Sequence, residues 1–353
     1  MANLVQTLMT TLAFGSLYAL IALGYTMVYG TLKFINFAHS DIVVLGAWTS
    51  FTLATWILPW VGINPRAQGD LIPPIWVAAV ILTLAMAFCG LVGFLIERFA
   101  YRPLRKAPRL NVLITAIGVS LLLQNLGQLD VTIRDLPLIG RYLDGFLAMI
   151  PGVRMLCDQH FGFGAIPQKM PYLLPQWDLF TISLPSAGGH TDVSLTLVDA
   201  LIIGASAVLM IALQFLVFRT KIGSAMRAVS YDFDAAALMG IPVDRVVSFT
   251  FVFGSVLAAA AGFLYSLKYP GLNQTAFPTW VLLGLKAFVA AVIGGIGNIR
   301  GAVLGGFVIA FVEQVGAFYL GADYRDVYVF ALLIAILLVR PSGLLGSNMR
   351  EKV

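Results

Sequence analysis

Two charged residues of opposite sign lie inside apolar stretches in the C-terminal third of the sequence. Lys286 lies in the run 280–296, and Glu313 lies in the next run, 302–320. If the two runs form a hairpin of helices through NIRG, both side chains lie at a similar depth. A charge at mid-membrane costs about 2.5–3.5 kcal/mol on insertion scales. We therefore favour an ion pair that holds the two helices in register. A direct contact with a ligand or gate, and solvation in a cavity, are the alternatives.

A second group of polar residues, in the stretch KFINFAHSD, lies at the start of another apolar run. Asn36, His39 and Asp41 could line the mouth of a pathway at a broken helix. Asn36 or Ser40 could instead satisfy the free amides at the N-terminus of a helix. We favour the helix cap. The three histidines lack the spacing of metal ligands, so we expect no metal site.

A short polar segment, SYDFDAAALMGIPVDR, separates two long apolar runs. Ser230, Asp232 and Asp234 can each cap a helix, and acids suit the positive end of the helix dipole. The residues that follow are strong helix formers, and Gly240 and Pro242 are typical of a helix end. We predict a helix of about two turns whose small residues face outward and let another protein approach closely. The alternative is a loop helix lying along the bilayer surface.

The composition excludes a water-soluble domain. Of 353 residues, 59% are hydrophobic and 11% are charged, whereas soluble domains carry about 25% charged residues. Apolar runs of about 20 residues recur, which is the length of a helix that spans a bilayer. The alternating pattern of a membrane barrel is absent. The sequence therefore predicts an all-α, polytopic transmembrane helical bundle that forms a single domain.

Nine apolar runs are candidate transmembrane spans. They lie at 8–30, 37–58, 75–96, 111–129, 197–218, 246–267, 280–296, 302–320 and 327–339. The glycine-rich run 280–296 fits a re-entrant or broken helix, and 327–339 is short for a full crossing. We therefore predict eight or nine spans.

The distribution of basic residues predicts the orientation in the membrane. Lysine and arginine collect in 97–110, in 219–245 and in the C-terminal tail. Cytoplasmic loops carry such an excess, so these segments, and the C-terminus, are expected in the cytoplasm. The long segment 130–196 is then an extracytoplasmic insertion, either a cap packed on the helices or a docking surface. The net charge of +5 is explained by this topology and calls for no nucleic acid.

Three glycines spaced four residues apart, Gly297, Gly301 and Gly305, follow Lys286. Small residues at this spacing let helix backbones approach closely. We expect them to pack against a neighbouring helix or a second subunit. Glycine-broken helices also line transport paths, and the sequence does not separate these roles.

Six stretches in order resemble the permease subunits of branched-chain amino acid ABC importers, the LivH-type family. They read GSLYALIALGYTMVYG, INFAHSD, IERFAYRPLR, DFDAAALMGIPVDRV, KAFVAAVIGGIGNIRGAVLGG and PSGLLG. The resemblance covers nearly the whole chain. Two positions depart from the family pattern: Tyr231 replaces the usual acid, and Ser40 replaces a glycine.

The resemblance implies that the segment 219–245 is a coupling loop that seats in a groove of a cytoplasmic ATPase. Asp232, Ala236, Gly240 and Arg245 match the family pattern there. The implied assembly contains a second homologous permease, or a second copy, together with two ABC ATPases and an extracytoplasmic substrate-binding protein in a bacterial inner membrane. The implied substrate is leucine, isoleucine or valine, with urea or short amides as the alternative within the family.

Several sequence signatures of other functions are missing. No G-x-x-x-x-G-K-[ST] motif occurs, so the chain has no P-loop to cradle nucleotide phosphates. We expect no enzymatic activity and no cofactor, because ATP would be used by the partner subunits. An ion-coupled transporter acting alone is the rival interpretation, and Lys286 and Glu313 are its candidate coupling groups.

Overall fold

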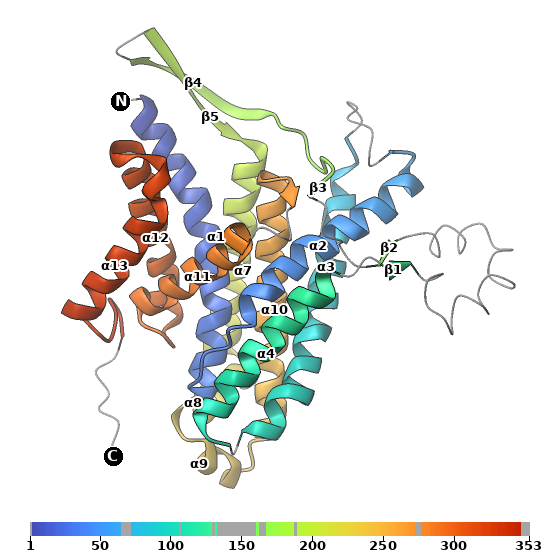
Figure 1. Cartoon of the computed structure of the whole chain (residues 1–353), viewed down its shortest axis with the longest axis vertical. Coiled ribbons are helices and arrows are strands. Elements are labelled where there is room, and N and C mark those ends of the chain that lie inside the picture. Colours follow the sequence, from blue (N-terminus) through green and yellow to red (C-terminus); the bar gives the residue numbers. More distant parts are fainter. Residues whose placement is uncertain are drawn as a thin grey trace, which may run out of the picture.

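The computed structural model is a bundle of long helices with a few short strands (Figure 1). The described residues are 2–64, 72–105, 107–128, 131–132, 160–161, 167–186, 189–272 and 277–346. The first cysteine, Cys89, is buried in this bundle, and the second lies outside the described residues.

Seven helical segments in the described part are long and apolar enough to cross a membrane. Their helices are α1 (Ala2–Leu32), α2 (His39–Ile57), α3 (Ile75–Ile96), α4 (Arg109–Gln128), α7 (Leu197–Arg219), α10 (Val243–Lys268) and α12 (Ile299–Leu320). They coincide with seven of the nine predicted spans. The predicted helical membrane bundle is therefore confirmed.

The two remaining predicted spans form shorter helices. α11 (Phe277–Gly294) has a described apolar part of only Leu282–Gly294, and α13 (Arg325–Val339) has 15 residues. At 1.5 Å per residue, α13 extends about 22 Å, less than the roughly 30 Å of a bilayer core. The 3-10 turn η6 (Ala322–Tyr324) precedes α13, and Pro341 follows it.

Proline and capping residues set several helix boundaries. Pro74 and Pro242 immediately precede α3 and α10, where a missing amide proton is tolerated. Thr196 caps α7 by accepting a hydrogen bond from the Asp199 amide at 3.2 Å. After α2, the 3-10 turn η1 (Leu58–Val61) ends at Gly62, which has a positive φ of 79°. The positions of these residues in the sequence thus fix where the spans begin and end.

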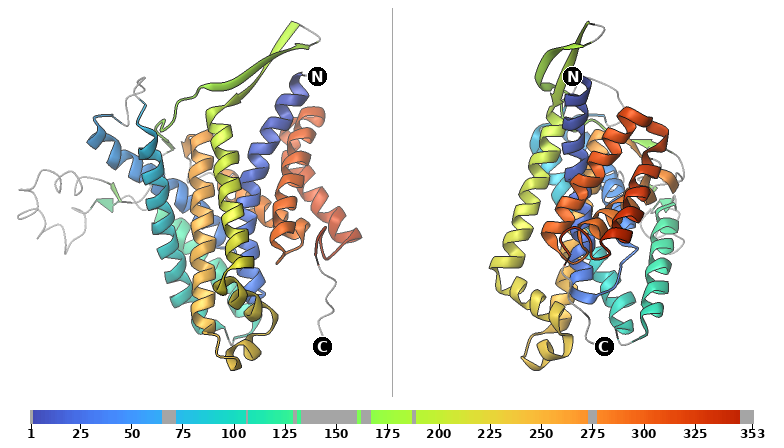
Figure 2. Two further views of the ribbon diagram at one scale, coloured as in Figure 1. Left: turned by 180° about the vertical axis from the view of Figure 1, so that it is seen from behind. Right: turned by 90° about the vertical axis from the view of Figure 1, so that its left-hand side faces the viewer.

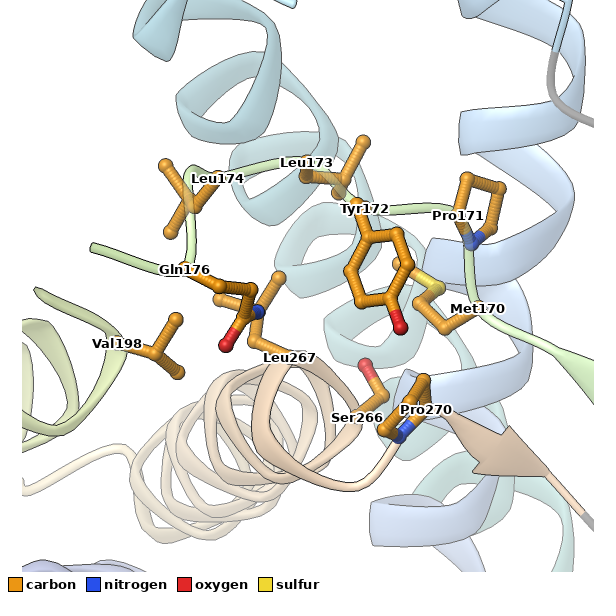
Figure 3. A pocket seen from close by; sticks show the side chains of 10 residues that line it. All are labelled: Met170, Pro171, Tyr172, Leu173, Leu174, Gln176, Val198, Ser266, Leu267 and Pro270. Atoms are coloured by element: carbon orange, nitrogen blue, oxygen red, sulfur yellow. The ribbon is translucent and has the colours of Figure 1, made fainter. Parts of the chain in front are cut away.

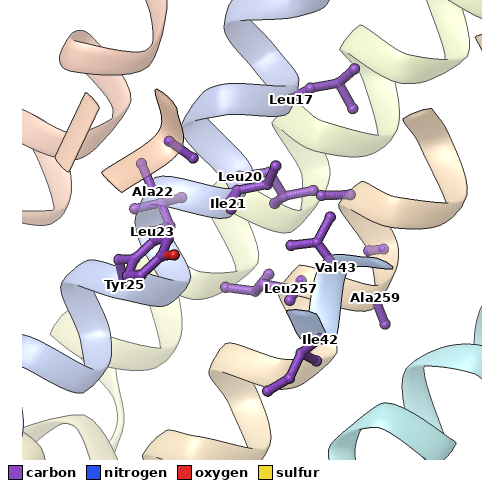
Figure 4. Packing of buried hydrophobic residues seen from close by; sticks show 14 of the residues in the cluster. Leu17, Leu20, Ile21, Ala22, Leu23, Tyr25, Ile42, Val43, Leu257 and Ala259 are labelled. Carbon is purple, nitrogen blue, oxygen red and sulfur yellow. The ribbon is translucent and has the colours of Figure 1, made fainter. Parts of the chain in front are cut away.

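The core lies between α1, α2 and α10, which are the most buried of the long helices. α10 packs on α3, α2 and α1, and α1 packs along α12. Leu17 and Leu20 of α1, Val43 of α2, and Leu257 and Ala259 of α10 interdigitate in this core (Figure 4). α3, α4 and α7 are much less buried, as expected for helices whose outer faces meet lipid or another subunit.

Three two-stranded antiparallel sheets lie in the described part of the chain. They pair β1 (Val131–Thr132) with β2 (His160–Phe161), β3 (Gln168–Lys169) with β6 (Gly271–Leu272), and β4 (Asp178–Ser186) with β5 (Gly189–Thr196). The β4–β5 hairpin was not anticipated from the sequence. It extends beyond the helices at one end of the molecule (Figure 1).

The opposite end carries two short helices, α8 (Lys221–Tyr231) and α9 (Phe233–Leu238). The junction between α3 and α4 lies at this same end, whereas the N-terminus of α1 lies at the hairpin end (Figures 1 and 2). Two of the three basic segments therefore share one end of the bundle. Of the basic residues of the C-terminal tail, Arg340 directly follows α13, whereas Arg350 and Lys352 lie outside the described residues.

Candidate functional site

The short capped segment forms an elbow of two helices, α8 and α9, in place of one isolated helix. Asp232 ends α8 and caps α9, because its Oδ1 accepts a hydrogen bond from the Ala235 amide at 2.8 Å. The amide of Gly240 then bonds to the Ala237 carbonyl at 3.0 Å, and Gly240 has a φ of 78°. This left-handed conformation favours glycine, so the elbow turns sharply into α10.

The outer surface of the elbow matches the expected one only in part. The sequence interpretation had small residues facing outward. Ala235 and Ala237 are exposed as predicted, but Ala236 is buried against the protein. The exposed tip consists of Leu238 and Met239, whose exposures are 88% and 83%, and Tyr231 is exposed beside it. A helix of six residues is too short for its sequence to define a face, so the packing of Ala236 decides which side chains point out. The result is an apolar tip at the basic end of the bundle.

A network of charges joins the turns that follow α3 to the start of α10, which is the helix that follows the elbow in the chain. Arg102 and Arg105 both bind the carboxylate of Asp244, and Arg105 also binds Glu97. Ser248 donates a further hydrogen bond to Glu97, which is fully buried. Glu97 lies on a π-helical turn η2 (Glu97–Tyr101), Arg102 lies on the 3-10 turn η3 (Arg102–Leu104), and Arg105 directly follows η3. The remaining residues lie on α10. This junction network fixes α10, and therefore the elbow, relative to α3.

Arg245, also predicted for the coupling loop, does not join the junction network. It lies exposed in the first turn of α10 and lines a groove beside the elbow. Of the four predicted coupling residues, Asp232 and Gly240 thus shape α9, Ala236 anchors it, and Arg245 lies next to it.

A buried ion cluster lies within the bundle, where the sequence placed two opposite charges. The Nζ atom of Lys286 lies 3.0 Å from Oε1 of Glu313, and both side chains are at most 10% exposed. Lys286 also lies 2.7 Å from the Asp326 carboxylate, and the Tyr18 hydroxyl donates to Glu313 at 2.7 Å. These four residues join α11, α12, α13 and α1. The cluster therefore ties the short helices α11 and α13 to the longest helix of the bundle.

Tyr18 and Asp326 were missed by the sequence analysis. Tyr18 is one of several aromatic residues in a long apolar run, and nothing in its neighbours marks it as a partner of Glu313. Asp326 offered a signal, because it is an acid at the first turn of a short apolar helix. Its carboxylate is half exposed, so it connects the buried pair to the surface of the protein.

The loop between α1 and α2 is organised by the side chain of Asn36. Its Oδ1 accepts hydrogen bonds from the Ala38 amide at 3.1 Å and from the Tyr101 hydroxyl at 2.6 Å. This is a turn just before α2 and not the helix cap favoured from the sequence, because the N-cap residue Ala38 makes no side-chain capping hydrogen bond and the Ser40 hydroxyl donates to the Phe37 carbonyl. His39 packs its ring edge against Tyr25, with the ring centroids 4.6 Å apart. Asp41 binds Gln124 of α4 at 2.8 Å. The polar residues of this loop thus hold neighbouring helices together.

The predicted glycine motif divides into two roles. Gly301 and Gly305 lie in α12 where a Cβ would overlap the carbonyl oxygens of Gly294 and Ala290 in α11. They permit close packing of the two helices, within this chain. Gly297 does not take the expected packing role, because it lies in the turn between the helices with a φ of 92°. The four-residue spacing of the glycines could not show that α12 begins only after Gly297.

The turn between α11 and α12 is closed by residues 340–346. Asn298 caps α12 by accepting from the Gly301 amide at 3.3 Å, and its Nδ2 donates to the Leu345 carbonyl at 2.7 Å. The amides of Leu344 and Leu345 donate to the carbonyls of Ile293 and Gly294 at 2.8 and 3.0 Å. The PSGLLG stretch therefore closes a helical hairpin whose turn residue Asn298 lies 47 residues before Leu345.

At the hairpin end of the molecule, residues 170–176 lie across the end of α10 (Figure 3). Met170 and Leu173 are buried, and the Met170 amide donates to the Pro270 carbonyl at 2.7 Å. In the last turn of α10, Lys268 forms an ion pair with Asp199 in the first turn of α7. Part of the segment 130–196 therefore packs as a cap. Its remaining part includes residues outside the described ranges.

A family model and the full-length relatives of the chain all point to the same group of membrane transport proteins. Residues 7–337 match the family described as "Branched-chain amino acid transport system / permease component". The high-affinity branched-chain amino acid transport system permease protein LivH of Salmonella typhimurium is 36% identical over 348 residues, which covers 99% of this chain and 97% of the relative. LivH of Escherichia coli K12 is 36% identical over 351 residues, with the same coverage. BraD of Pseudomonas aeruginosa, a permease protein of the same description, is 36% identical over 348 residues with the same coverage. No solved structure matches the chain.

Proposed function

The chain belongs to the permease family of branched-chain amino acid transport systems, and from this premise we propose that it forms the membrane path of an ATP-driven importer for leucine, isoleucine and valine. It is a multi-pass membrane protein with several apolar spans. In the proposed assembly it pairs with a second homologous permease in the inner membrane, with its C-terminus in the cytoplasm. An extracytoplasmic protein delivers the amino acid. Two ABC ATPases supply the energy, so this chain needs no cofactor.

The observation that carries this proposal is the apolar tip of the α8–α9 elbow. Leu238 and Met239 are almost fully exposed at the basic end of the bundle, beyond the ends of the apolar spans. Large apolar side chains in such a position are typical of a protein contact. Ala236 anchors the tip to the protein, and the junction network connects α10 to α3. A push on the tip would therefore be transmitted to two long helices together.

The coupling proposal is tested by replacing the tip residue Leu238 with glutamate. Burying a leucine at an interface contributes about 1.5–3 kcal/mol, so we expect the affinity for the ATPases of the transport system to fall about 10- to 100-fold. The measurement is co-purification of the ATPases with the tagged permease from detergent. Leu179→Glu, an equally apolar-to-acid change on the exposed hairpin at the opposite end, is the matched control. Equal ATPase recovery from both variants and the wild type would overturn the coupling role.

The substrate is tested with the complete transporter in proteoliposomes. We expect ATP inside the vesicles, on the side of the ATPases, to drive leucine, isoleucine or valine inward when the binding protein is supplied outside. Urea and acetamide are offered in parallel. Uptake of urea but not leucine would move the assignment to the amide branch of the family. Uptake driven by a proton gradient without ATP would favour the ion-coupled alternative, in which the Lys286–Glu313 pair is the candidate coupling site.

A further inference from the structure

A groove of about 900 Å³ opens between α3, α10 and the α8–α9 elbow. We propose that this groove binds the headgroup and part of an acyl chain of an anionic phospholipid. The site requires only that the chain spans a bilayer, and it does not depend on the identity of the transported substrate. We call it the arginine groove, after the residues that give it its charge: Arg98, Arg102 and Arg245.

The charge of the arginine groove is not balanced by the acids around it. Asp244, which also lines the groove, is bound by Arg102 and by Arg105. Among the described residues, Arg98 and Arg245 have no ion-pair partner, and both are exposed. Two guanidinium groups are therefore left to bind an anion from solution or from the membrane. Guanidinium binds phosphate oxygens in a two-pronged geometry that suits a phosphodiester.

The other walls of the arginine groove are apolar and rise toward the membrane interior. Phe94 of α3 lies four residues before Arg98 of η2, and Val252 lies seven residues after Arg245 on α10. Seven residues of helix rise about 10.5 Å, so the groove runs from a cationic rim to an apolar wall at acyl-chain depth. Phe249 lines the same wall. A free phosphate would use only the rim, whereas a phospholipid would fill both parts.

The remaining wall comes from the elbow and its turn into α10. Ala237, Ile241 and Pro242 line the groove on this side. A bound lipid would therefore contact the segment that carries the exposed tip of Leu238 and Met239. Basic pockets at the cytoplasmic side of membrane helices are typical sites for anionic headgroups. The lipid would thus brace the elbow against α3 and α10.

The proposal is tested with the purified full chain in nanodiscs of phosphatidylcholine containing a minor fraction of phosphatidylglycerol. Lipids that stay bound are counted by native mass spectrometry after release. We compare the wild type with Arg98→Gln and with the Arg98→Gln/Arg245→Gln double variant. Each arginine near an anionic headgroup contributes about 1 kcal/mol, which is about a fivefold preference for the anionic lipid over phosphatidylcholine. We therefore expect a loss of roughly 30-fold in selectivity for phosphatidylglycerol in the double variant.

The matched control is Arg219→Gln/Lys221→Gln, which removes two exposed positive charges at the same end of the bundle but outside the groove. The proposal predicts that this control keeps its phosphatidylglycerol. An equal loss in the control would show a diffuse surface attraction and overturn the proposal. Unchanged elution volume and melting temperature of each variant show that the fold is intact.

Two further experiments test whether the arginine groove binds a free anion or an ATPase in place of a phospholipid. If millimolar inorganic phosphate displaces phosphatidylglycerol completely, or if water-soluble glycerophosphate binds as well, the groove is an anion site and not a lipid site. If wild type shows no preference for phosphatidylglycerol while the groove variants lose the ATPases in phosphatidylcholine alone, the groove is part of the ATPase contact. Both outcomes contradict the proposal, whereas retention of phosphatidylglycerol through both arms supports it.

Discussion

Replacing Lys286 with methionine tests whether the buried ion cluster stabilises the bundle. The change keeps the length of the side chain but removes the cation that Glu313 and Asp326 share. Among the described residues, Glu313, at 4% exposure, then keeps only the Tyr18 hydroxyl as a hydrogen-bond partner. Removing one partner of a buried pair costs about 3–5 kcal/mol. The half-exposed Asp326 adds about 1 kcal/mol or less. We therefore expect the free energy of unfolding to fall by about 3–5 kcal/mol.

The reciprocal change should cost less, because the cluster is asymmetric. In Glu313→Gln, the lysine keeps Asp326 at 2.7 Å and the amide oxygen still accepts hydrogen bonds. The expected loss is about 1.5–3 kcal/mol, the value of a hydrogen bond to a charged group. In the double variant Lys286→Met/Glu313→Gln, no buried charge is left uncompensated. We expect it to be more stable than Lys286→Met alone by about 1 kcal/mol or more.

The assay is unfolding of the purified chain in mixed detergent micelles, followed by circular dichroism. Asp326→Asn serves as the control, because it removes only the exposed contact of Lys286. The reasoning is refuted if Lys286→Met costs no more than Glu313→Gln, or if the two losses simply add in the double variant. Additive losses would mean that the two side chains do not interact, despite their separation of 3.0 Å.

Three further predictions follow from single contacts. Gly305→Leu should lower the free energy of unfolding by about 1–3 kcal/mol through overpacking. Gly204→Leu should leave it nearly unchanged, because no neighbouring atom lies within 4 Å of its Cβ position. Unfolding titrations of the two variants make the comparison. Asp232→Ala should raise hydrogen exchange in α9 by removing a cap worth about 1 kcal/mol, and Asp234→Ala should leave exchange there nearly unchanged. Tyr101→Phe removes one of two hydrogen bonds to the loop asparagine and should cost about 0.5–1.5 kcal/mol in the same titration.

The sequence was sufficient to locate the long helices and some of the polar contacts. Apolar length alone placed the seven spans, because a chain in lipid must satisfy its backbone internally. The opposite charges of Lys286 and Glu313 were enough to suggest that these side chains meet. Asp232 and Gly240 were found because capping and left-handed turns depend on local residue types.

What the sequence missed depends on contacts between distant segments. The partners Tyr18 and Asp326 lie on two other helices, and no local pattern points to Glu313. The direction of Leu238 is set by the burial of Ala236, because α9 is too short to show a period. The pairing of β4 with β5 was missed because their segment was read as one irregular insertion.

The closure of the α11–α12 hairpin by residues 340–346 has a consequence for biosynthesis. The ribosome delivers Asn298 well before Leu345, so this turn must wait for a segment made 47 residues later. Until then, the carbonyls of Ile293 and Gly294 lack the amide donors that they have in the finished protein. A chain cut short before residue 340 would keep all seven long spans and yet carry an open turn. Such a truncated chain would leave these two carbonyls to find other hydrogen-bond partners, and its α11–α12 turn would be less stable than in the finished protein.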